Sequence, residues 1–370
     1  MKSWTAILAR WACVVTRHPV RGLLPALRTL VARGSLTLAD ERGLAEARGA
    51  ADPRGLDEDP RGRGERAARL TVTVTLLCPV RGCGQLLTRG ERAVSCPRGH
   101  AFDVARSGYV NLLQPQDRRS AMPGDRPEAA VARRRLYAAG HGEPLLAALR
   151  AQLDVCPLPT CPTVLDVGCG EGFLLGALAA ERPLEAHGLD LSAPAIDLAA
   201  RRYPGAAWVV ANADRLLPYA DGSFDVVLVV SARLNPQELR RVIAPEGRLL
   251  VATPAPDDLV ELRGALLGEP LERDRLARAL ATLAPAFTLE ARAGARDVVT
   301  LDAAAIRDVL AATYRGARHS QRARLDDLGG MRVTMSHDVA RLRLSSPENG
   351  GSGRGDRRRQ ARRERPIAGP

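Results

Sequence analysis

The order of apolar and polar positions predicts a central domain of alternating strands and helices. Residues 164–167 form a buried strand that ends in the glycine turn DVGCGEG, and a helical run follows over Phe173–Ala180. Further strands are expected in AHGLDLS, AAWVVANAD, FDVVLVV and RLLVATP, and helices in APAIDLAARRYP and PQELRRVIAPEG, the latter ending at Gly247. Strands separated by helices predict an α/β fold with a parallel, doubly wound sheet, whose ligands bind beyond the carboxyl ends of the strands. The later stretches FTLEARAGARDVVTLDAAAIRDVL and MRVTMSHDVARLRL predict two closing strands around a helix.

Residues 76–113 hold three of the seven cysteines and one of the six histidines. Four residues separate Cys78 from Cys83, twelve separate Cys83 from Cys96, and three separate Cys96 from His100. Two closely spaced ligand pairs joined by a hairpin-length connector suit tetrahedral zinc, and GQLLTRGERAVS predicts that hairpin with a turn near Gly90. The spacing therefore predicts a Zn²⁺ site, which a segment with so small a core needs in order to fold.

The glycine turn predicts a nucleoside cofactor. Gly168, Gly170 and Gly172 allow a ligand to approach the backbone closely at the start of a helix. Asp190 ends the next expected strand and can accept both ribose hydroxyls, and the polar residues Asn212 and Asp214 end the third strand, within reach of an adenine. Three such features at consecutive strand ends favour S-adenosylmethionine over NAD.

Charge is unevenly distributed along the chain. The formal net charge of +12 concentrates on the ends and on residues 76–142, which carry +6, whereas residues 143–344 carry −3. This distribution favours an anionic partner for the cysteine-rich segment. No apolar run approaches the roughly 18 residues of a membrane helix, so no membrane partner is expected. An odd number of irregularly spaced cysteines argues against a secreted disulfide scaffold and for a reducing, cytoplasmic location.

These patterns divide the chain into five segments. Residues 1–75 are interpreted as a disordered or dispensable leader, 76–115 as a zinc-binding module, 116–150 as a helical connector, 151–344 as the cofactor-binding domain and 345–370 as a disordered basic tail. Within the connector, residues 133–135 are three consecutive arginines. They suit phosphate binding, and a solvated helix face is the alternative.

Five stretches together resemble a known family: CPRGHAFDVARSGYVNLL, PGDRPEAAVARRRLYAAGHGEPL, VLDVGCGEGF, GLDLSAPAIDLAARRYP and ATPAPDDLVEL. They are similar to the zinc-containing 23S ribosomal RNA (guanine-N1)-methyltransferases of the RlmA/TlrB type, over about residues 76–344. The resemblance implies a class I methyltransferase domain beside an N-terminal zinc module. It also implies methylation of a guanine in a hairpin loop of 23S rRNA. Related actinobacterial proteins modify the guanine linked to tylosin resistance, so macrolide resistance is a further expectation.

The resemblance also assigns roles to positions of this chain. It places the zinc ligands on Cys78, Cys83, Cys96 and His100. The cofactor-binding positions that we expect, from the resemblance and from location at strand ends, are Gly142, Asp166, Gly168, Gly170, Gly172, Phe173, Leu174, Leu175, Asp190, Asn212, Asp214 and Asp258.

The chain departs from the family's pattern near the expected cofactor. Gly142 stands where an aromatic residue is usual, residues 231–233 replace an aromatic-alanine-proline run, and Asp258 stands where histidine is frequent. Guanine N1 carries a proton at neutral pH, so its methylation needs a proton acceptor. Asp214 and Asp258 are candidates for that base by location only. A small-molecule methyltransferase and a catalytically impaired RNA-binding homologue remain alternatives, and the oligomeric state is open, with a homodimer as one option.

Overall fold

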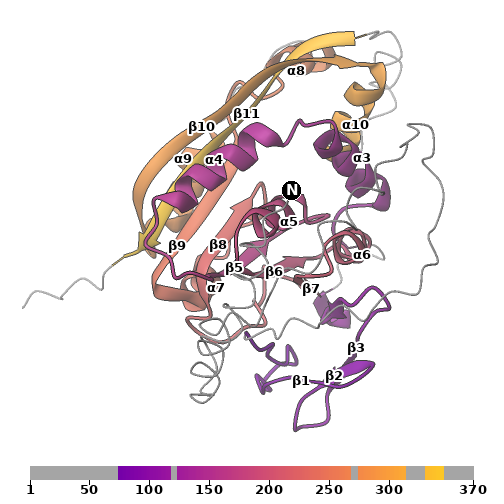
Figure 1. Cartoon of the computed structure of the whole chain (residues 1–370), viewed down its shortest axis with the longest axis vertical. Helices are drawn as coiled ribbons and strands as arrows, with labels where there is room; N and C mark the ends of the chain where they lie inside the picture. Colours follow the sequence, from indigo (N-terminus) through magenta and orange to yellow (C-terminus); the bar gives the residue numbers. More distant parts are fainter. Residues whose placement is uncertain (1–73, 118–122, 268–273, 314–329, 346–370) are drawn as a thin grey trace, which may run out of the picture.

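A single eight-stranded sheet forms the centre of the protein (Figure 1). The computed structural model describes residues 74–117, 123–267, 274–313 and 330–345. The strand order is β10-β11-β9-β8-β5-β6-β7-β4, and pairing is parallel except along β11, which lies antiparallel between β9 and β10. The strands are β4 (Val110–Asn111), β5 (Thr163–Val167), β6 (Glu185–Asp190), β7 (Ala207–Val210), β8 (Phe224–Val230), β9 (Ile243–Pro254), β10 (Phe287–Asp302) and β11 (Gly330–Leu344).

Helices cover both faces of this sheet, because its central strand β5 is buried along its whole length and offers no face to water. Helices α4, α5 and α6 pack on one face, and α7 and α9 pack on the other. The helices are α3 (Pro127–Ala138), α4 (Glu143–Asp154), α5 (Phe173–Glu181), α6 (Ala193–Arg202), α7 (Pro236–Val242), α8 (Val260–Leu267), α9 (Arg275–Leu283) and α10 (Ala303–Thr313). The predicted doubly wound α/β fold is confirmed.

One predicted boundary is wrong. The helix expected to run to Gly247 ends at Val242, and Ile243 begins β9 by pairing with Phe224. Pro245 explains the difference, since a proline disfavours helical backbone at the residue before it and cannot donate a helical hydrogen bond. The β-branched pair Val242–Ile243 then suits the strand better than a last helical turn.

The two closing strands extend beyond the rest of the sheet. β11 pairs with β10 over its full length but with β9 only from His337 to Arg343, so its first half projects past the carboxyl ends of the parallel strands. A separate apolar cluster from α3, α8, α10 and the projecting strands fills the space under it, and it includes Leu136, Leu262, Ile306, Val309 and Val333. This cluster holds α3 on the side of the sheet where the glycine turn lies. The prediction of late strands around a helix is confirmed.

The cysteine-rich segment forms a small sheet of its own, β1 (Thr88–Arg89), β2 (Ala93–Ser95) and β3 (Ala101–Asp103), beside β7 in Figure 1. The predicted hairpin is confirmed, with Arg89 opposite Val94. Its chain then enters the large sheet, because β4 pairs with β7. The boundary predicted at residue 115 stays a prediction. The leader and the basic tail lie almost entirely outside the described residues.

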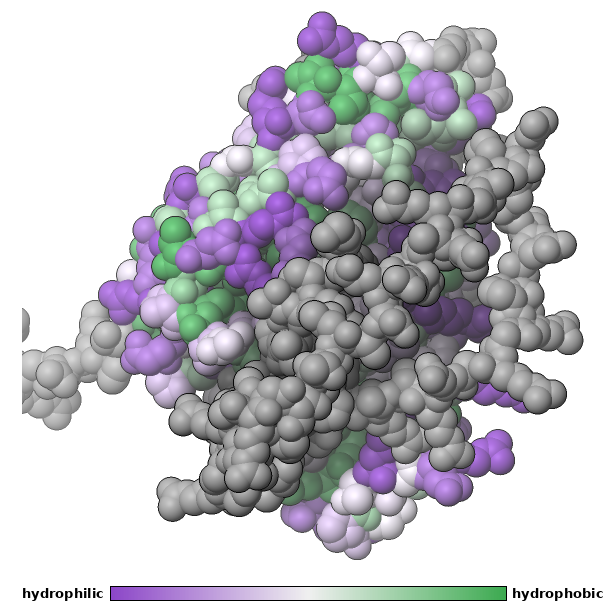
Figure 2. Space-filling model, in the orientation of Figure 1, coloured by the Kyte–Doolittle hydropathy of each residue, from purple (hydrophilic) through white to green (hydrophobic). Residues whose placement is uncertain are grey.

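The outer surface mixes polar and apolar residues. On the face in Figure 2, hydrophilic and hydrophobic residues are interspersed, including at both ends of the molecule. Within the described ranges, none of the helices has both the length and the apolar content needed to cross a membrane.

An ion pair fastens the cysteine-rich segment to the large domain. Arg215, in the loop after β7, contacts Asp117 through Nε at 2.8 Å and donates from Nη2 to the carbonyl of Pro79 at 3.0 Å. The Asp117 side chain is only 5% exposed, so removing the arginine leaves a buried carboxylate without its cation.

We expect Arg215→Met to lower the free energy of unfolding by about 2 kcal/mol in urea titrations, because an unpaired buried charge is costly. The matched control is Arg201→Met, whose side chain is 70% exposed and pairs with Asp197 on the surface of α6. The control should lose under about 0.5 kcal/mol. Equal losses of unfolding free energy in the two variants would contradict a stabilising role for the Arg215–Asp117 pair.

Candidate metal and cofactor sites

The four predicted zinc ligands meet at one point. One ligand atom from each of Cys78, Cys83, Cys96 and His100 lies within 4.8 Å of all the others. His100 Nδ1 is 3.5 Å from Cys78 Sγ and 3.4 Å from Cys96 Sγ, and the sulfurs of Cys83 and Cys96 are 3.8 Å apart. A zinc tetrahedron with Zn–S of about 2.3 Å and Zn–N of about 2.0 Å has S–S edges of about 3.8 Å and S–N edges of about 3.5 Å. The donor set therefore has the size that zinc requires.

The surroundings of the sulfurs also suit a cation. Burial raises the pKa of the Cys78 thiol to about 11, so this sulfur becomes a thiolate only with a positive partner. At Cys96 burial acts in the same direction, but hydrogen bonds from the backbone at His100 and Arg98 outweigh it and lower the pKa to about 6. A divalent metal supplies the charge that the buried thiolates need.

The second site is the glycine turn between β5 and α5. Gly168, Gly170 and Gly172 all have positive φ, at 79°, 57° and 80°. Side chains are excluded there by close neighbours: a Cβ on Gly168 would stand 2.4 Å from the Cβ of Ala232, and one on Gly170 would stand 2.8 Å from Nη1 of Arg133. The bare backbone of the turn is what a bound nucleoside cofactor requires.

Three acidic side chains surround this turn. Asp166 is 2% exposed, and burial together with Asp190 and Glu171 raises its pKa to about 8. Asp166 Oδ1 is buried without a hydrogen-bond partner in the described structure, and Glu171 is paired with Arg133 by a long contact of 3.5 Å between Nη1 and Oε2. A buried carboxylate without enough hydrogen bonds or positive charge around it costs folding free energy, and a bound ligand can supply these partners. The turn is therefore prepared for a cationic ligand, and S-adenosylmethionine carries a sulfonium and an ammonium group.

Asp190 lies at the end of β6, as predicted. Its Oδ2 accepts a hydrogen bond from the backbone N–H of Gly170 at 2.9 Å, and its Oδ1 accepts one from Ser192 at 2.8 Å. Each oxygen keeps a second lone pair, so both can still accept a ribose hydroxyl. The contacts fix the carboxylate against the turn, which suits the predicted role.

Gly142 has a structural explanation that the sequence did not reveal. The rings of Tyr137 and Phe173 stack with centroids 4.4 Å apart, and a Cβ on Gly142 would stand 2.5 Å from the first ring and 2.7 Å from the second. These two rings occupy the space that a side chain at residue 142 would need, and cofactor contact by Gly142 stays a prediction. Leu174 and Leu175 follow Phe173 into the core under α5, where their packing is evident, and cofactor contact by either stays a prediction.

The third strand end carries the other predicted polar residues. Asn212 accepts a hydrogen bond from the backbone N–H of Asp214 at 3.0 Å, and Asp214 pairs with Arg233 at 3.2 Å. Arg233 belongs to the loop that follows β8. Ser231 begins this loop with φ of 53°, a conformation that is strained for a residue with a side chain. Ala232 lies against the glycine turn, so the loop after β8 closes over it without the proline that the family usually has.

Asp258 lies apart from these groups. It follows β9, and its Oδ1 accepts a hydrogen bond from the backbone N–H of Ser336 in β11 at 2.9 Å. Burial raises its pKa to about 6. Its hydrogen bond to Ser336 ties it to the β11 side of the sheet, so cofactor contact by Asp258 stays a prediction.

Sequence reasoning missed two residues beside the glycine turn. Arg133 is one of three consecutive arginines with no distinguishing mark, and the structure places it half-buried against the turn while Arg134 and Arg135 stay exposed. Glu171 lies inside the glycine motif, but nothing in the motif shows that its side chain turns into the protein. Only the tertiary pairing of α3 with the turn reveals both.

Comparisons with known proteins agree with this geometry. The family described as "RlmA, N-terminal", a zinc ribbon, matches residues 76–121, and the family "Methyltransferase domain" matches residues 164–251. The 23S rRNA (guanine(748)-N(1))-methyltransferase of Streptomyces fradiae is 37% identical over 247 residues, 66% of this chain and 86% of that protein. The chain belongs to the 23S rRNA (guanine-N1)-methyltransferase family.

Other similarities extend over parts of the chain. A Micromonospora griseorubida protein, provisionally named as a member of the same family, is 39% identical over 226 residues, 55% of this chain and 75% of that protein. Among solved structures, a SAM-dependent methyltransferase from Thiobacillus denitrificans in complex with S-adenosyl-L-homocysteine is 19% identical, with a TM-score of 0.36, over 60% of this chain and 92% of that one. As a member of this family, the protein is a methyltransferase with S-adenosylmethionine and zinc as its cofactors.

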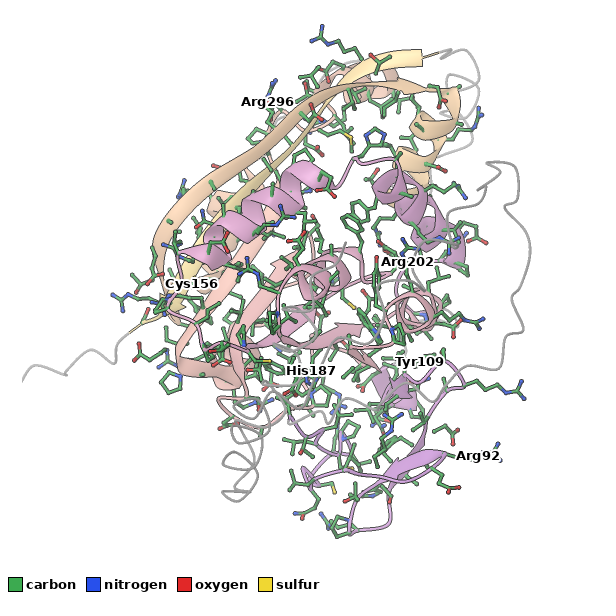
Figure 3. The ribbon with its side chains drawn as sticks, in the orientation of Figure 1. Arg92, Tyr109, Cys156, His187, Arg202 and Arg296 are labelled. Carbon is green, nitrogen blue, oxygen red and sulfur yellow. The ribbon has the colours of Figure 1, made fainter. Side chains whose placement is uncertain are left out.

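Replacing one ligand tests the metal site. We expect Cys96→Ser to lose stoichiometric zinc, measured by elemental analysis of the purified protein, because one of four ligands is removed. Cys156→Ser is the matched control, since Cys156 donates to the carbonyl of Gln152 and lies on the opposite side of the view in Figure 3 from Arg92 of the zinc hairpin. Zinc retained in the first variant or lost in the control would contradict the assignment.

Asp166 makes cofactor affinity depend on pH. Since its pKa is raised to about 8, the free protein holds this carboxyl largely protonated at pH 6. A cationic ligand favours the ionised form, so binding releases a proton and affinity rises with pH. Between pH 6 and 7.5, calorimetry should show affinity for S-adenosylmethionine rising by up to about tenfold per unit.

Asp166→Asn should remove most of this slope, whereas the surface control Asp197→Asn should keep it. A wild-type affinity that does not change over this range would show that Asp166 takes no part in binding the cofactor.

Proposed function

We propose that this protein transfers a methyl group from S-adenosylmethionine to N1 of a guanine in a hairpin loop of 23S rRNA. The observation that carries the proposal is that a Cys₃His metal module is joined, through the pairing of β4 with β7, to the same sheet that carries the glycine turn. The metal module argues for an RNA acceptor, because a methyltransferase that acts on a small molecule has no need of a basic metal module. The names of the relatives supply the base and the atom.

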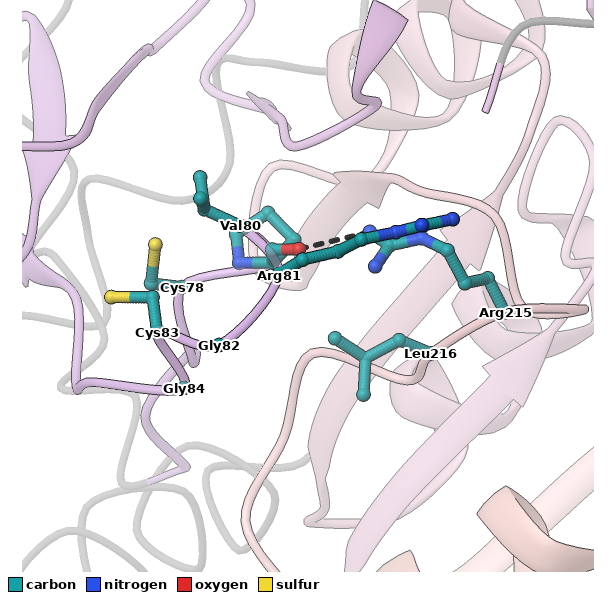
Figure 4. Close-up of a pocket in the computed structure, with 9 residues that line it drawn as sticks. Cys78, Val80, Arg81, Gly82, Cys83, Gly84, Arg215 and Leu216 are labelled. Atoms are coloured by element: carbon teal, nitrogen blue, oxygen red, sulfur yellow. Dashed lines mark hydrogen bonds between the residues drawn. The ribbon is translucent and has the colours of Figure 1, made fainter. Parts of the chain in front are cut away.

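The seam between the two parts supports an RNA contact. A hollow of about 390 Å³ is lined by residues 78–84 of the zinc loop together with Arg215 and Leu216 (Figure 4). Arg81 brings an exposed guanidinium group to this hollow, and Arg215, which is paired with Asp117, directly follows Asp214 after the third strand. A strand of RNA held by the basic module would thus continue towards the cofactor. A base in a loop can be turned out of its stack at little cost, as methylation of N1 requires.

The chemistry asks little of the protein beyond positioning. S-adenosylmethionine supplies an electrophilic methyl group, and the enzyme holds the acceptor nitrogen in line with it. The loop after β8, with strained Ser231 and the Asp214–Arg233 pair, closes on the glycine turn and is placed to contact the incoming base. Because Asp214 is already paired with Arg233 and Asp258 is tied to β11, proton removal from N1 by water remains consistent with the described contacts.

Reverse transcription tests the proposal directly. N1 methylation blocks Watson–Crick pairing, so purified protein and S-adenosylmethionine should create one new strong stop on protein-free 23S rRNA, in the loop of a hairpin. The control is Asp190→Asn, which we expect to reduce the stop by at least about tenfold, because a carboxylate that accepts ribose hydroxyls is lost. The stop should disappear when the cofactor is omitted.

The alternatives give different results. Cofactor binding without any new stop would favour a small-molecule acceptor, and RNA binding without cofactor binding would favour a non-catalytic homologue. Either result would overturn the proposal.

A further inference from the structure

Arg133 of α3 reaches the glycine turn from a distant part of the chain. Its Nη2 donates to Asp125 Oδ2 at 2.7 Å and to the carbonyl oxygen of Ala312 at 3.3 Å. Its Nη1 lies 3.5 Å from Glu171 Oε2 and 2.8 Å from the point where a Cβ on Gly170 would stand. The guanidinium is therefore anchored through Nη2 and lies against the bare backbone of the turn through Nη1.

Nη1 keeps its hydrogen-bonding capacity. Among the residues that the structure describes, the hydrogen bonds of Arg133 all come from Nη2, and neither oxygen of Glu171 accepts one. Burial opposes the charge, but Glu171 and Asp125 outweigh it and raise the pKa of Arg133, so the group is a permanent cation. A cation and the unpartnered Asp166 Oδ1 thus stand at the same turn.

We propose that Arg133 is a positioning residue that binds the carboxylate of the methionine portion of S-adenosylmethionine through Nη1, while Asp166 faces the neighbouring ammonium group. This inference rests on the proposed function and deepens it. The amino-acid end of the cofactor is a zwitterion and needs both signs of charge at short range. Arg133 supplies the positive one, and its planar group suits a carboxylate.

The net charge of the turn agrees with this arrangement. Asp125, Asp166, Glu171 and Asp190 are four acids against one arginine, which leaves the site short of positive charge. S-adenosylmethionine brings a sulfonium and an ammonium against a single carboxylate, so it supplies a net positive charge. Arg133 offsets the charge of Glu171 beside it and supplies the cation that the only anionic group of this ligand needs.

Arg133 also links α3 to Asp125 and Ala312, so a purely structural role has to be separated from ligand contact. The test uses two ligands in calorimetry: S-adenosylmethionine, and its decarboxylated form, which keeps the sulfonium and the amine but lacks the carboxylate. A structural defect weakens the binding of both, whereas loss of a carboxylate contact weakens only the first.

We expect Arg133→Gln to lower affinity for S-adenosylmethionine about 30-fold, as for loss of a charge-assisted hydrogen bond. Affinity for the decarboxylated ligand should change by less than about threefold, because this ligand lacks the group that Arg133 contacts. Arg133→Lys should recover part of the loss, since it keeps the charge but not the planar group. The exposed neighbour variant Arg134→Gln is the matched control and should bind both ligands as the wild type does.

If Arg133→Gln lowered the affinity for both ligands equally, the residue would have a packing role. If the affinity for both were unchanged, Arg133 would not contact the carboxylate. Either result overturns the inference. The rRNA proposal fails separately. If S-adenosylmethionine binds with the expected ligand discrimination but no stop appears on 23S rRNA, the role of Arg133 is supported and the RNA target is wrong.

Discussion

The site depends on one electrostatic constraint, which is the burial of two carboxylates, Asp166 and Glu171, at a glycine-rich turn with Asp190 beside it. Two charged carboxylates cannot be buried without compensation, and Arg133, paired with Glu171, offsets only part of their charge. The free protein meets the cost partly by holding Asp166 protonated, since its pKa is raised to about 8. A cationic cofactor removes the same cost, so the unfavourable state of the empty turn contributes to ligand affinity.

Much of the remaining fold brings groups to this turn. The projecting half of the β10–β11 hairpin and the apolar cluster beneath it hold α3, and α3 carries Arg133 and Tyr137. At the other end, β4 and the Arg215–Asp117 pair fix the zinc module to the edge of the same sheet. The metal closes a module that is too small to be stable alone, and the ion pair sets its orientation relative to the strand ends. The two cofactors thus have different roles: zinc stabilises the fold of the small module, and S-adenosylmethionine supplies the methyl group.

The sequence predicted those features whose cause is local. The spacing of Cys78 to His100 predicts a ligand set, because each pair spans one turn of chain, and Asp190 is predictable because a strand end fixes its place. Features that depend on long-range packing were not predictable. The place of Arg133 depends on how α3 crosses the turn, and Gly142 is explained only by the stacked rings of Tyr137 and Phe173. The end of α7 at Val242 is a different case, because its cause is local: Pro245 is present in the sequence and disfavours helical backbone at the residue before it.

A crystal structure of the protein with S-adenosylhomocysteine tests the account most directly, because that ligand keeps the complete amino-acid end. The account predicts the ligand's carboxylate within about 3.2 Å of Arg133 Nη1 and its ammonium group facing Asp166. A ligand whose amino-acid end lies away from the turn, with Arg133 still beside Glu171 alone, would contradict it.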